Sequence, residues 1–554
     1  MISERRRSPW AYIPLLYFLQ AVPVALVQEV STVVYKDLGI PNELILRWTS
    51  LIALPWSLQM LFGPLVDLNS TKRKWILGGQ ALIAIALVLS AFLTNLPHAF
   101  ELTLVTFAAS AILSTLCNIA TDGFAIMAMD TTEQARFAGI MSTFYKLGRL
   151  FCVSLLVFVA GRMMPVATPE NARHVWAIVL MIAAGVYGVG HLIARFALPT
   201  VASDQPRTAP DFTKLSPGDP SPPSPLSPRG ARGSASSNET QENLKRTLYL
   251  VGTMLTGYFA GNAAVRLVAD VLADPLHLPG WHLPATNHIP LLDGMLAGPP
   301  PGQIGGPVQT ELAQMVLCGA IAAFCFSQAR RTIRGSQMGE SLSTFFAQPG
   351  IRGIVFFILF YRMAEAMVSK MSALFLKDTI ANGGLALPNE QLGTLNGLMG
   401  IGGIIVGGIL GGFVVSKIGL RRAFWPLAFA MHLPNLLYLL VSLHAIPMLS
   451  LQLPFIGPLN WTMGLVLFVD QFGYGFGYAA YMVYLMRVAQ RGQFATSHYA
   501  IAVGLGALTI AMSGILGGVI QSNFGYPGFF VAVMIVAIPG LLSLLFIPLE
   551  EPAA

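Results

Sequence analysis

Long stretches without a single charged residue constrain this chain more than any other feature. Two of them run from Trp75 to Leu96 and from Phe529 to Pro548. A helix of roughly 20 apolar residues spans the hydrocarbon core of a bilayer. Because lipid offers the backbone no hydrogen-bond partner, such segments fold as helices or as a closed barrel. The stretches are continuously apolar rather than alternating, so we predict an all-α protein that crosses the membrane many times.

The charge content supports this class. Only 11% of the 554 residues are charged, whereas soluble domains carry about 25%. The net charge is +7, and basic residues that border membrane spans account for such an excess without nucleic acid. The four cysteines lie in apolar stretches and lack the spacing of metal ligands. We therefore expect the lipid bilayer as a partner, no nucleic acid, no metal and no cofactor.

The apolar stretches predict fourteen transmembrane helices, an even number that places both termini on one side. Their ranges are roughly 11–28, 46–66, 75–95, 102–128, 137–161, 174–198, 247–267, 310–329, 351–376, 391–415, 422–443, 461–486, 497–520 and 527–548. Loops on the side of the termini carry the basic residues, whereas the loop 444–460 has no charge. The positive-inside rule therefore predicts that both termini are cytoplasmic.

Composition also predicts the domain organisation. Residues 1–200 form an N-terminal six-helix half, and residues 346–554 form a C-terminal six-helix half. The segment 201–246 is rich in Pro, Ser and Gly, which predicts a disordered cytoplasmic linker. Residues 247–345 hold two extra helices, separated by a long periplasmic loop at about 270–309.

A short pattern follows the second long helix of each half. It combines glycine, an acidic or small polar residue, and a basic turn. Its members are Gly63, Asp67 and Arg73 in the first half, and Gly412, Gly419 and Arg421 in the second. Two parallel six-helix repeats are the architecture of major facilitator transporters. The pattern resembles the gating-loop motif of that superfamily, although Ser416 replaces the acid in the second copy.

Charged residues inside the predicted spans are candidates for function, because each costs roughly 2.5–3.5 kcal/mol at membrane depth. The carboxylates Asp122, Glu365 and Asp470 fall on the fourth, ninth and twelfth spans. A carboxylate in low-dielectric surroundings holds a proton more readily than it does in water. We predict that these three couple transport to protons. A fixed salt bridge, such as Asp122 with Arg149, is the structural alternative.

Other polar side chains on these spans are candidate solute contacts. The basic ones would hold an anionic solute or act as counter-ions, and the aromatic and amide ones suit a large, sugar-like solute. They are Tyr17, Gln20, Glu29, Tyr145, Lys146, Arg149, Arg362, Lys370, Gln471 and Tyr474. No catalytic motif occurs, so we do not expect an enzyme.

Several segments carry a closer family resemblance. The most similar are Tyr17–Pro23, Ala120–Asp122, Tyr361–Glu365 and Gln471–Gly475. They resemble the AmpG-type muropeptide permeases and related acetyl-CoA transporters of the major facilitator superfamily. The resemblance implies proton-driven import of a cell-wall muropeptide across a bacterial inner membrane, and we expect a monomer. Ile126 and Gly397 stand where those permeases usually carry Asp and Lys.

Two other functions remain open at this point. One is a proton-coupled exporter of small molecules. The other is a sensor or scaffold that does not transport and binds a cytoplasmic partner through its linker. Deletion of residues 205–240 distinguishes a transporter from a scaffold, because a transporter keeps its uptake whereas a scaffold loses its output.

Overall fold

The computed structural model describes residues 8–57, 59, 62, 66, 70–129, 131–164, 168–201, 204, 245, 248–249, 252–253, 256, 308–333, 337–453, 457–491 and 495–548. It comprises two compact units. The first combines residues 1–206 with residues 345–554, and the second holds residues 207–344. The first unit therefore contains both predicted six-helix halves and can be described as one body.

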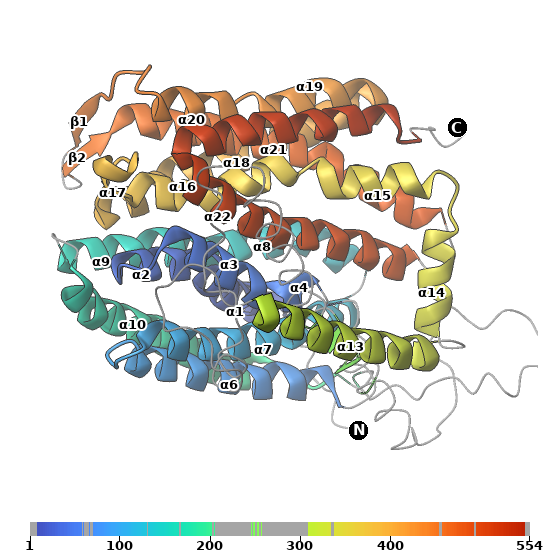
Figure 1. Cartoon of the computed structure of the whole chain (residues 1–554). Helices are drawn as coiled ribbons and strands as arrows, with labels where there is room; N and C mark the ends of the chain where they lie inside the picture. Colours follow the sequence, from blue (N-terminus) through green and yellow to red (C-terminus); the bar gives the residue numbers. More distant parts are fainter. Residues whose placement is uncertain are drawn as a thin grey trace, which may run out of the picture. The chain divides into compact units, whose positions relative to one another are not determined.

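Helices account for the N-terminal half of the first unit (Figure 1). They are η1 (Pro9–Ala11), α1 (Ile13–Ala25), η2 (Leu26–Val30), α2 (Ser31–Asp37), α3 (Asn42–Ile52), α4 (Leu54–Ser57), α6 (Lys72–Leu93), α7 (Ala99–Ala128), α8 (Thr131–Leu150), η3 (Phe151–Leu156), α9 (Val157–Met163) and α10 (Pro169–Ala197). The segments α1, η2 and α2 follow one another without a break, as do α8, η3 and α9. In each series a π-helical segment interrupts the α-helix, a feature often found at functional sites.

The C-terminal half is also mainly helical, and one of its helices again contains a π-helical segment, Leu395–Ile401. Its elements are α15 (Ile351–Phe360), α16 (Met363–Lys377), η6 (Ile380–Asn382), α17 (Asn389–Thr394), η7 (Leu395–Ile401), α18 (Gly402–Ile418), α19 (Leu420–His432), α20 (Asn435–Ser442), β1 (Ser450–Leu453), β2 (Gly457–Asn460), α21 (Trp461–Gln490), α22 (Ala495–Leu542) and η8 (Ser543–Leu545). The non-helical backbone of Gly525 divides α22 into two helices. In the second unit, α13 (Val308–Ile333) is a long helix, and α14 (Gln337–Phe346) follows it in the chain.

Among the described residues, eight helices are long and apolar enough to cross a membrane. The predicted class, an all-α protein with many membrane spans, is confirmed. The number fourteen stays a prediction, because most residues of the seventh predicted span lie outside the described residues. Most of the linker and almost all of the 270–309 loop lie outside them too.

One element departs from the all-helical prediction. Strands β1 and β2 pair antiparallel, with Ser450 opposite Asn460 and Leu453 opposite Gly457. The hairpin lies in the uncharged loop 444–460. Its two strands hydrogen-bond to each other and so satisfy backbone N–H and C=O groups that are not part of a helix.

Glycines bring two helices of the C-terminal half together. A Cβ on Gly407 of α18 would lie 2.1 Å from the carbonyl oxygen of Phe472 on α21. A Cβ on Gly475 of α21 would lie 2.5 Å from the carbonyl oxygen of Ile404. Small residues of this kind permit close packing of membrane helices, so these glycines allow α18 and α21 to lie in backbone contact.

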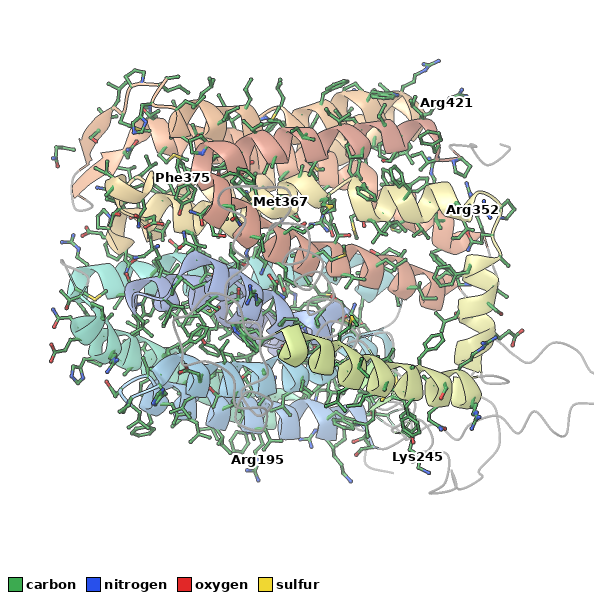
Figure 2. All side chains as sticks on the ribbon, viewed as in Figure 1. Arg195, Lys245, Arg352, Met367, Phe375 and Arg421 are labelled. Atoms are coloured by element: carbon green, nitrogen blue, oxygen red, sulfur yellow. The ribbon has the colours of Figure 1, made fainter. Side chains whose placement is uncertain are left out.

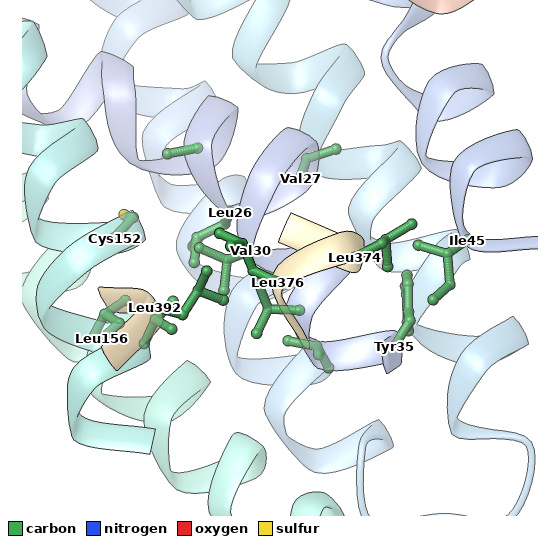
Figure 3. Close-up of a cluster of buried hydrophobic side chains, with 14 of the residues drawn as sticks. Leu26, Val27, Val30, Tyr35, Ile45, Cys152, Leu156, Leu374, Leu376 and Leu392 are labelled. Carbon is green, nitrogen blue, oxygen red and sulfur yellow. The ribbon is translucent and has the colours of Figure 1, made fainter. Parts of the chain in front are cut away.

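The two halves meet at several helix pairs, among them α3 with α22, α4 with α22, α2 with α16 and α9 with α17. A buried apolar cluster continues across this junction (Figure 3). Val30 and Ile45 of the first half belong to it, together with Leu374, Leu376 and Leu392 of the second. Apolar contact and direct helix packing thus join the halves next to the ends of α2 and α16.

Candidate functional site

Glu29 and Arg149 form a bidentate ion pair between η2 and α8. The Arg149 Nε lies 2.8 Å from Glu29 Oε1, and Nη2 donates to Oε2 at 3.1 Å. The planar guanidinium matches the carboxylate in this geometry, which makes the pair stronger than a single contact. Arg149 therefore pairs with Glu29 and not with Asp122, so the particular salt bridge suggested from the sequence is wrong.

Asp122 lies on α7 and faces α1. The hydroxyl of Tyr17 donates a hydrogen bond to its Oδ1 at 2.9 Å. Its side chain is exposed, and within the described part of the chain no cation lies at ion-pair distance from it. Asp122 is therefore a carboxylate that a hydroxyl orients and that keeps access to its surroundings.

Arg362 occupies the break between α15 and α16, where Tyr361 and Arg362 leave the α-helix. Its Nη2 donates to the Tyr474 hydroxyl at 2.9 Å, and its Cζ lies 4.6 Å from the ring centre of Tyr478. The carboxylate of Glu365 lies farther away, with 3.9 Å between Arg362 Nη2 and Glu365 Oε2. Cations are attracted to aromatic faces at such distances. Hydroxyl and ring contacts thus hold this buried guanidinium more closely than its carboxylate does.

Buried polar atoms in this region lack hydrogen-bond partners. They include Arg362 Nε, Glu365 Oε2, Asp470 Oδ1 and Gln20 Oε1. The other oxygen of Asp470 accepts from Gln471 at 3.0 Å and from Tyr438 at 3.4 Å. Leaving such an atom unsatisfied costs about 1–3 kcal/mol, so this region is suited to bind something further.

Lys370 connects the two halves. Its Nζ lies 3.5 Å from the carbonyl oxygen of Gln28. Glu29 stands seven residues before Lys36, and Lys370 stands seven residues before Lys377. Equivalent positions of the two halves thus carry opposite charges.

Two further predicted solute contacts lie on α8 near Arg149. Tyr145 and Lys146 are both half-buried. Within the described residues, Lys146 has no carboxylate at ion-pair distance. Lys146 and Lys370 therefore both place positive charge near the Glu29–Arg149 pair, where it can attract an anionic group. We call the set Asp122, Glu29, Arg149, Arg362, Glu365, Lys370 and Asp470 the central charged group.

The predicted gating loops are only partly described. Gly63 and Asp67 lie outside the described residues. Arg73 is the second residue of α6, and its side chain donates to the carbonyl oxygens of Arg195 and Leu198, at 3.3 and 3.4 Å. Its backbone N–H and that of Lys72 donate to Asp204, which caps this helix.

In the second half, Gly412 faces open space. Gly419 separates α18 from α19 with φ of 78°, a left-handed value that glycine adopts at low cost. Figure 2 shows Arg421 and Arg352 at one edge of the view, with Met367 and Phe375 inside the bundle. These positions are compatible with basic loops at a membrane surface.

Sequence reasoning missed a second polar cluster, at the end where α2 and α16 finish. We call it the rim cluster, and it consists of Lys36, Asp37, Asn42, Lys377, Asp378 and Asn389. All six are polar side chains at span ends, where polar residues are ordinary, so no single position signals them. A signal was present in the repeated Lys-Asp and Pro-Asn-Glu sequences of the two halves.

Asp378 shows the electrostatics of this cluster. Burial alone raises the pKa of its carboxyl, but hydrogen bonds from Asn382, Lys36 and Asn42 outweigh burial. The pKa of Asp378 is therefore lower than its ordinary value. The carboxylate is held in its charged form.

Comparison with solved structures identifies the fold. A peptide transporter POT in complex with sulfate matches with a TM-score of 0.54, covering 96% of this chain and 92% of that one, at 14% identity. A POT family transporter in complex with 5-aminolevulinic acid matches with a TM-score of 0.56, 96% and 95% coverage and 13% identity. The chain thus has the helical fold of these membrane transporters, and it is a multi-pass membrane protein.

Three proteins with similar sequences point to one particular group of relatives. An uncharacterised protein of Haemophilus influenzae is 26% identical over 216 residues, 38% of this chain and 48% of its own length. A transporter named AmpG 1 of Rickettsia bellii is 24% identical over 192 residues, 35% and 42% of the two lengths. The anhydromuropeptide permease of Escherichia coli K12 is 24% identical over 204 residues, 37% and 38% of the two lengths.

The matches confirm the resemblance to AmpG-type permeases. The chain spans less than half the length of the curated relatives it matches. No protein-family model matches it.

Proposed function

We propose that this protein is a secondary transporter that imports a muropeptide or similar sugar–peptide solute together with protons by alternating access. The observation that carries the proposal is the central charged group, which lies in a transporter fold and leaves buried polar atoms without partners. Charges at membrane depth are retained where they meet a partner, an ion or a solute. Membership of the fold alone would not indicate a solute site.

The central charged group suggests how a solute would be held. Arg362 presents an unpartnered Nε, and Lys370 and Lys146 add positive charge, so an anionic part such as a peptide carboxylate fits here. Tyr474 and Tyr478 lie stacked, with ring centres 5.4 Å apart. Their faces suit the apolar face of a sugar ring.

Proton coupling is assigned in this proposal to Asp122, Glu365 and Asp470. Asp122 has no ion-pair partner among the described residues, and Glu365 has only a distant one at 3.9 Å. A carboxylate that no cation neutralises closely can take up a proton when its surroundings dry and release it when they open to water. The proposal places the protein in the inner membrane with both termini in the cytoplasm, with the domain boundaries predicted from the sequence.

Uptake of labelled anhydro-muropeptide tests this proposal. The chain would be expressed in cells that lack their own permease, with and without a protonophore. Asp122→Asn and Glu365→Gln would run alongside Glu101→Gln, a matched carboxylate-to-amide change at an exposed position. We expect protonophore-sensitive uptake that both central variants abolish and the control keeps. No uptake by the parent, in membranes that contain folded protein, would refute the muropeptide assignment.

A further inference from the structure

A short sequence occurs twice, once in each half, at the end of the first long helix. Lys36-Asp37 is followed after three residues by Pro41-Asn42, and Lys377-Asp378 is followed after nine residues by Pro388-Asn389. In both copies the Lys-Asp pair ends one helical span and the asparagine begins the next, α3 or α17. The two copies therefore occupy equivalent places in the two halves.

The charged residues of each copy form ion pairs with those of the other copy. Lys36 lies 3.0 Å from Asp378, and Lys377 lies 2.5 Å from Asp37. Each lysine thus pairs with the aspartate of the other half, although an aspartate of its own half is its neighbour in sequence. Two ion pairs between equivalent positions of the two halves thus cross the junction.

The asparagines also bind the aspartate of the opposite half. The Asn42 amide donates to Asp378 at 3.0 Å, and the Asn389 amide donates to Asp37 at 2.6 Å. Each asparagine also accepts from the lysine of its own half, Asn42 from Lys36 at 2.8 Å and Asn389 from Lys377. Lysine and asparagine of one half therefore act together on one aspartate of the other.

An aromatic donor from the sixth helix of each half completes the arrangement. Trp176 Nε1 donates to Asp37 at 2.8 Å, and the Tyr526 hydroxyl donates to Asp378 at 3.0 Å. Both rings are fully buried. These bonds orient each aspartate from within its own half and would remain when the halves separate.

We propose that the rim cluster is a reversible two-fold latch that holds closed the end of the bundle at which α2 and α16 finish. Desolvation offsets most of the attraction in a buried ion pair, and water can solvate the separated charges again. A latch of charges therefore holds one arrangement and opens at moderate cost. The inference rests on the proposed alternating access, since only a transporter must open this end.

The two copies are unequal, which makes the latch testable pair by pair. The side chains of Lys377 and Asp37 are 6% and 1% exposed, whereas those of Lys36 and Asp378 are 16% and 4% exposed. Asp378 also accepts from Thr379 and Asn382 in the longer second loop. The Lys377–Asp37 pair, with the drier surroundings, should contribute more to closure.

Cysteine accessibility measures closure without any solute. Ser369 is exposed and lies one helical turn from Glu365 on the same face of α16, so Ser369→Cys, with the four native cysteines replaced by alanine, reports on the central region. A membrane-impermeant maleimide would be applied to intact cells and, separately, to inverted vesicles. A tag at the chain end identifies which face is which.

In the Ser369→Cys background, we expect the double variant Lys36→Met and Lys377→Met to be labelled about tenfold faster from the face where α2 and α16 end. The reason is a shift of population toward the state that is open at that face. Lys377→Met alone should have the larger share. Arg162→Gln removes the exposed Arg162–Glu390 pair at the same rim, 53% exposed on the arginine side, and should leave the rate within about twofold.

A locked variant covers the case in which the latch variants fail to fold. Arg162 and Glu390 pair across the halves, and the backbones touch there, since a Cβ on Gly161 would lie 2.2 Å from the backbone nitrogen of Glu390. At such a close approach, Arg162→Cys with Glu390→Cys should form a disulfide on oxidation. Oxidation should stop labelling from that face, and reduction should restore it. Unchanged labelling in the folded double lysine variant, an equal rise from both faces, or continued labelling of the oxidised variant would each overturn the latch. Absence of muropeptide uptake beside a normal labelling response would refute the solute and leave the latch intact.

Discussion

The central charged group and the rim cluster both combine acidic and basic side chains, but their hydrogen bonds are satisfied to different degrees. At the rim, each aspartate accepts from a lysine and an asparagine of the opposite half and from an aromatic residue of its own half. In the centre, Arg362 Nε, Glu365 Oε2 and Asp470 Oδ1 have no hydrogen-bond partner. A complete network stabilises one arrangement, whereas an incomplete one gains most from a ligand. The difference teaches that the rim serves closure and the centre serves binding.

The largest effect on stability should come from Asp37→Ala. It removes the acceptor shared by Lys377, Asn389 and Trp176, and it leaves a buried cation unpaired. We expect the free energy of unfolding in detergent to fall by about 3–5 kcal/mol. Glu29→Ala should cost less, because Glu29 is 31% exposed and its partner Arg149 is 36% exposed. An equal loss for both variants would remove the contrast between rim and centre.

The next effect concerns solute handling rather than stability. Arg362→Lys keeps the charge but loses the planar donor that contacts Tyr474 and Tyr478. The guanidinium and the ammonium are not interchangeable at such sites. We expect the apparent KM for uptake to rise about tenfold, the equivalent of roughly 1.4 kcal/mol, with little change in melting temperature. Arg352→Lys, at the edge of the bundle, is the matched control, and a similar KM change there would contradict the assignment.

A smaller effect should appear as a pH dependence at the rim. The pKa of Asp378 is lowered in the folded protein, so its contribution to stability is complete above the unfolded pKa of about 3.9. That contribution is lost as the pH falls from about 3.9 through the lower folded value. The melting-temperature difference between the parent and Asp378→Asn should therefore be constant at neutral pH and shrink in acid. A difference that grows on acidification would reverse the sign and exclude this account of Asp378.

The smallest effect should come from Arg162→Ala. This exposed pair with Glu390 belongs to the rim but not to the latch. Exposed ion pairs contribute about 0–1 kcal/mol, so thermal unfolding should shift little. A loss as large as that of Asp37→Ala would mean that the whole rim, rather than its two exchanged pairs, holds the halves together.

The sequence predicted the membrane class and the transporter resemblance because both depend on apolar length and on local motifs. The partner of Arg149 could not be predicted, since it depends on how η2 and α8 rotate against each other, and Glu29 and Asp122 were both within reach on neighbouring spans. The rim cluster was overlooked because Lys36 and Lys377 sit where polar residues are expected. What distinguishes them from ordinary polar residues at helix ends is that each pairs with an aspartate of the other half. That pairing can be seen only in the tertiary fold. The hairpin at 450–460 contains the turn residues Pro454, Gly457 and Pro458, but its strands of four residues each are too short to distinguish from an irregular loop.

Equilibrium binding of labelled anhydro-muropeptide to the purified protein tests the central claim most directly. Arg362→Gln removes a central cation with an unpartnered Nε, and Arg162→Gln removes a rim cation outside the latch. The account predicts that Arg362→Gln weakens binding by about tenfold or more and that Arg162→Gln leaves it unchanged. Equal affinity in the parent and both variants, or no binding by the folded parent, would contradict the claim that the centre is the solute site.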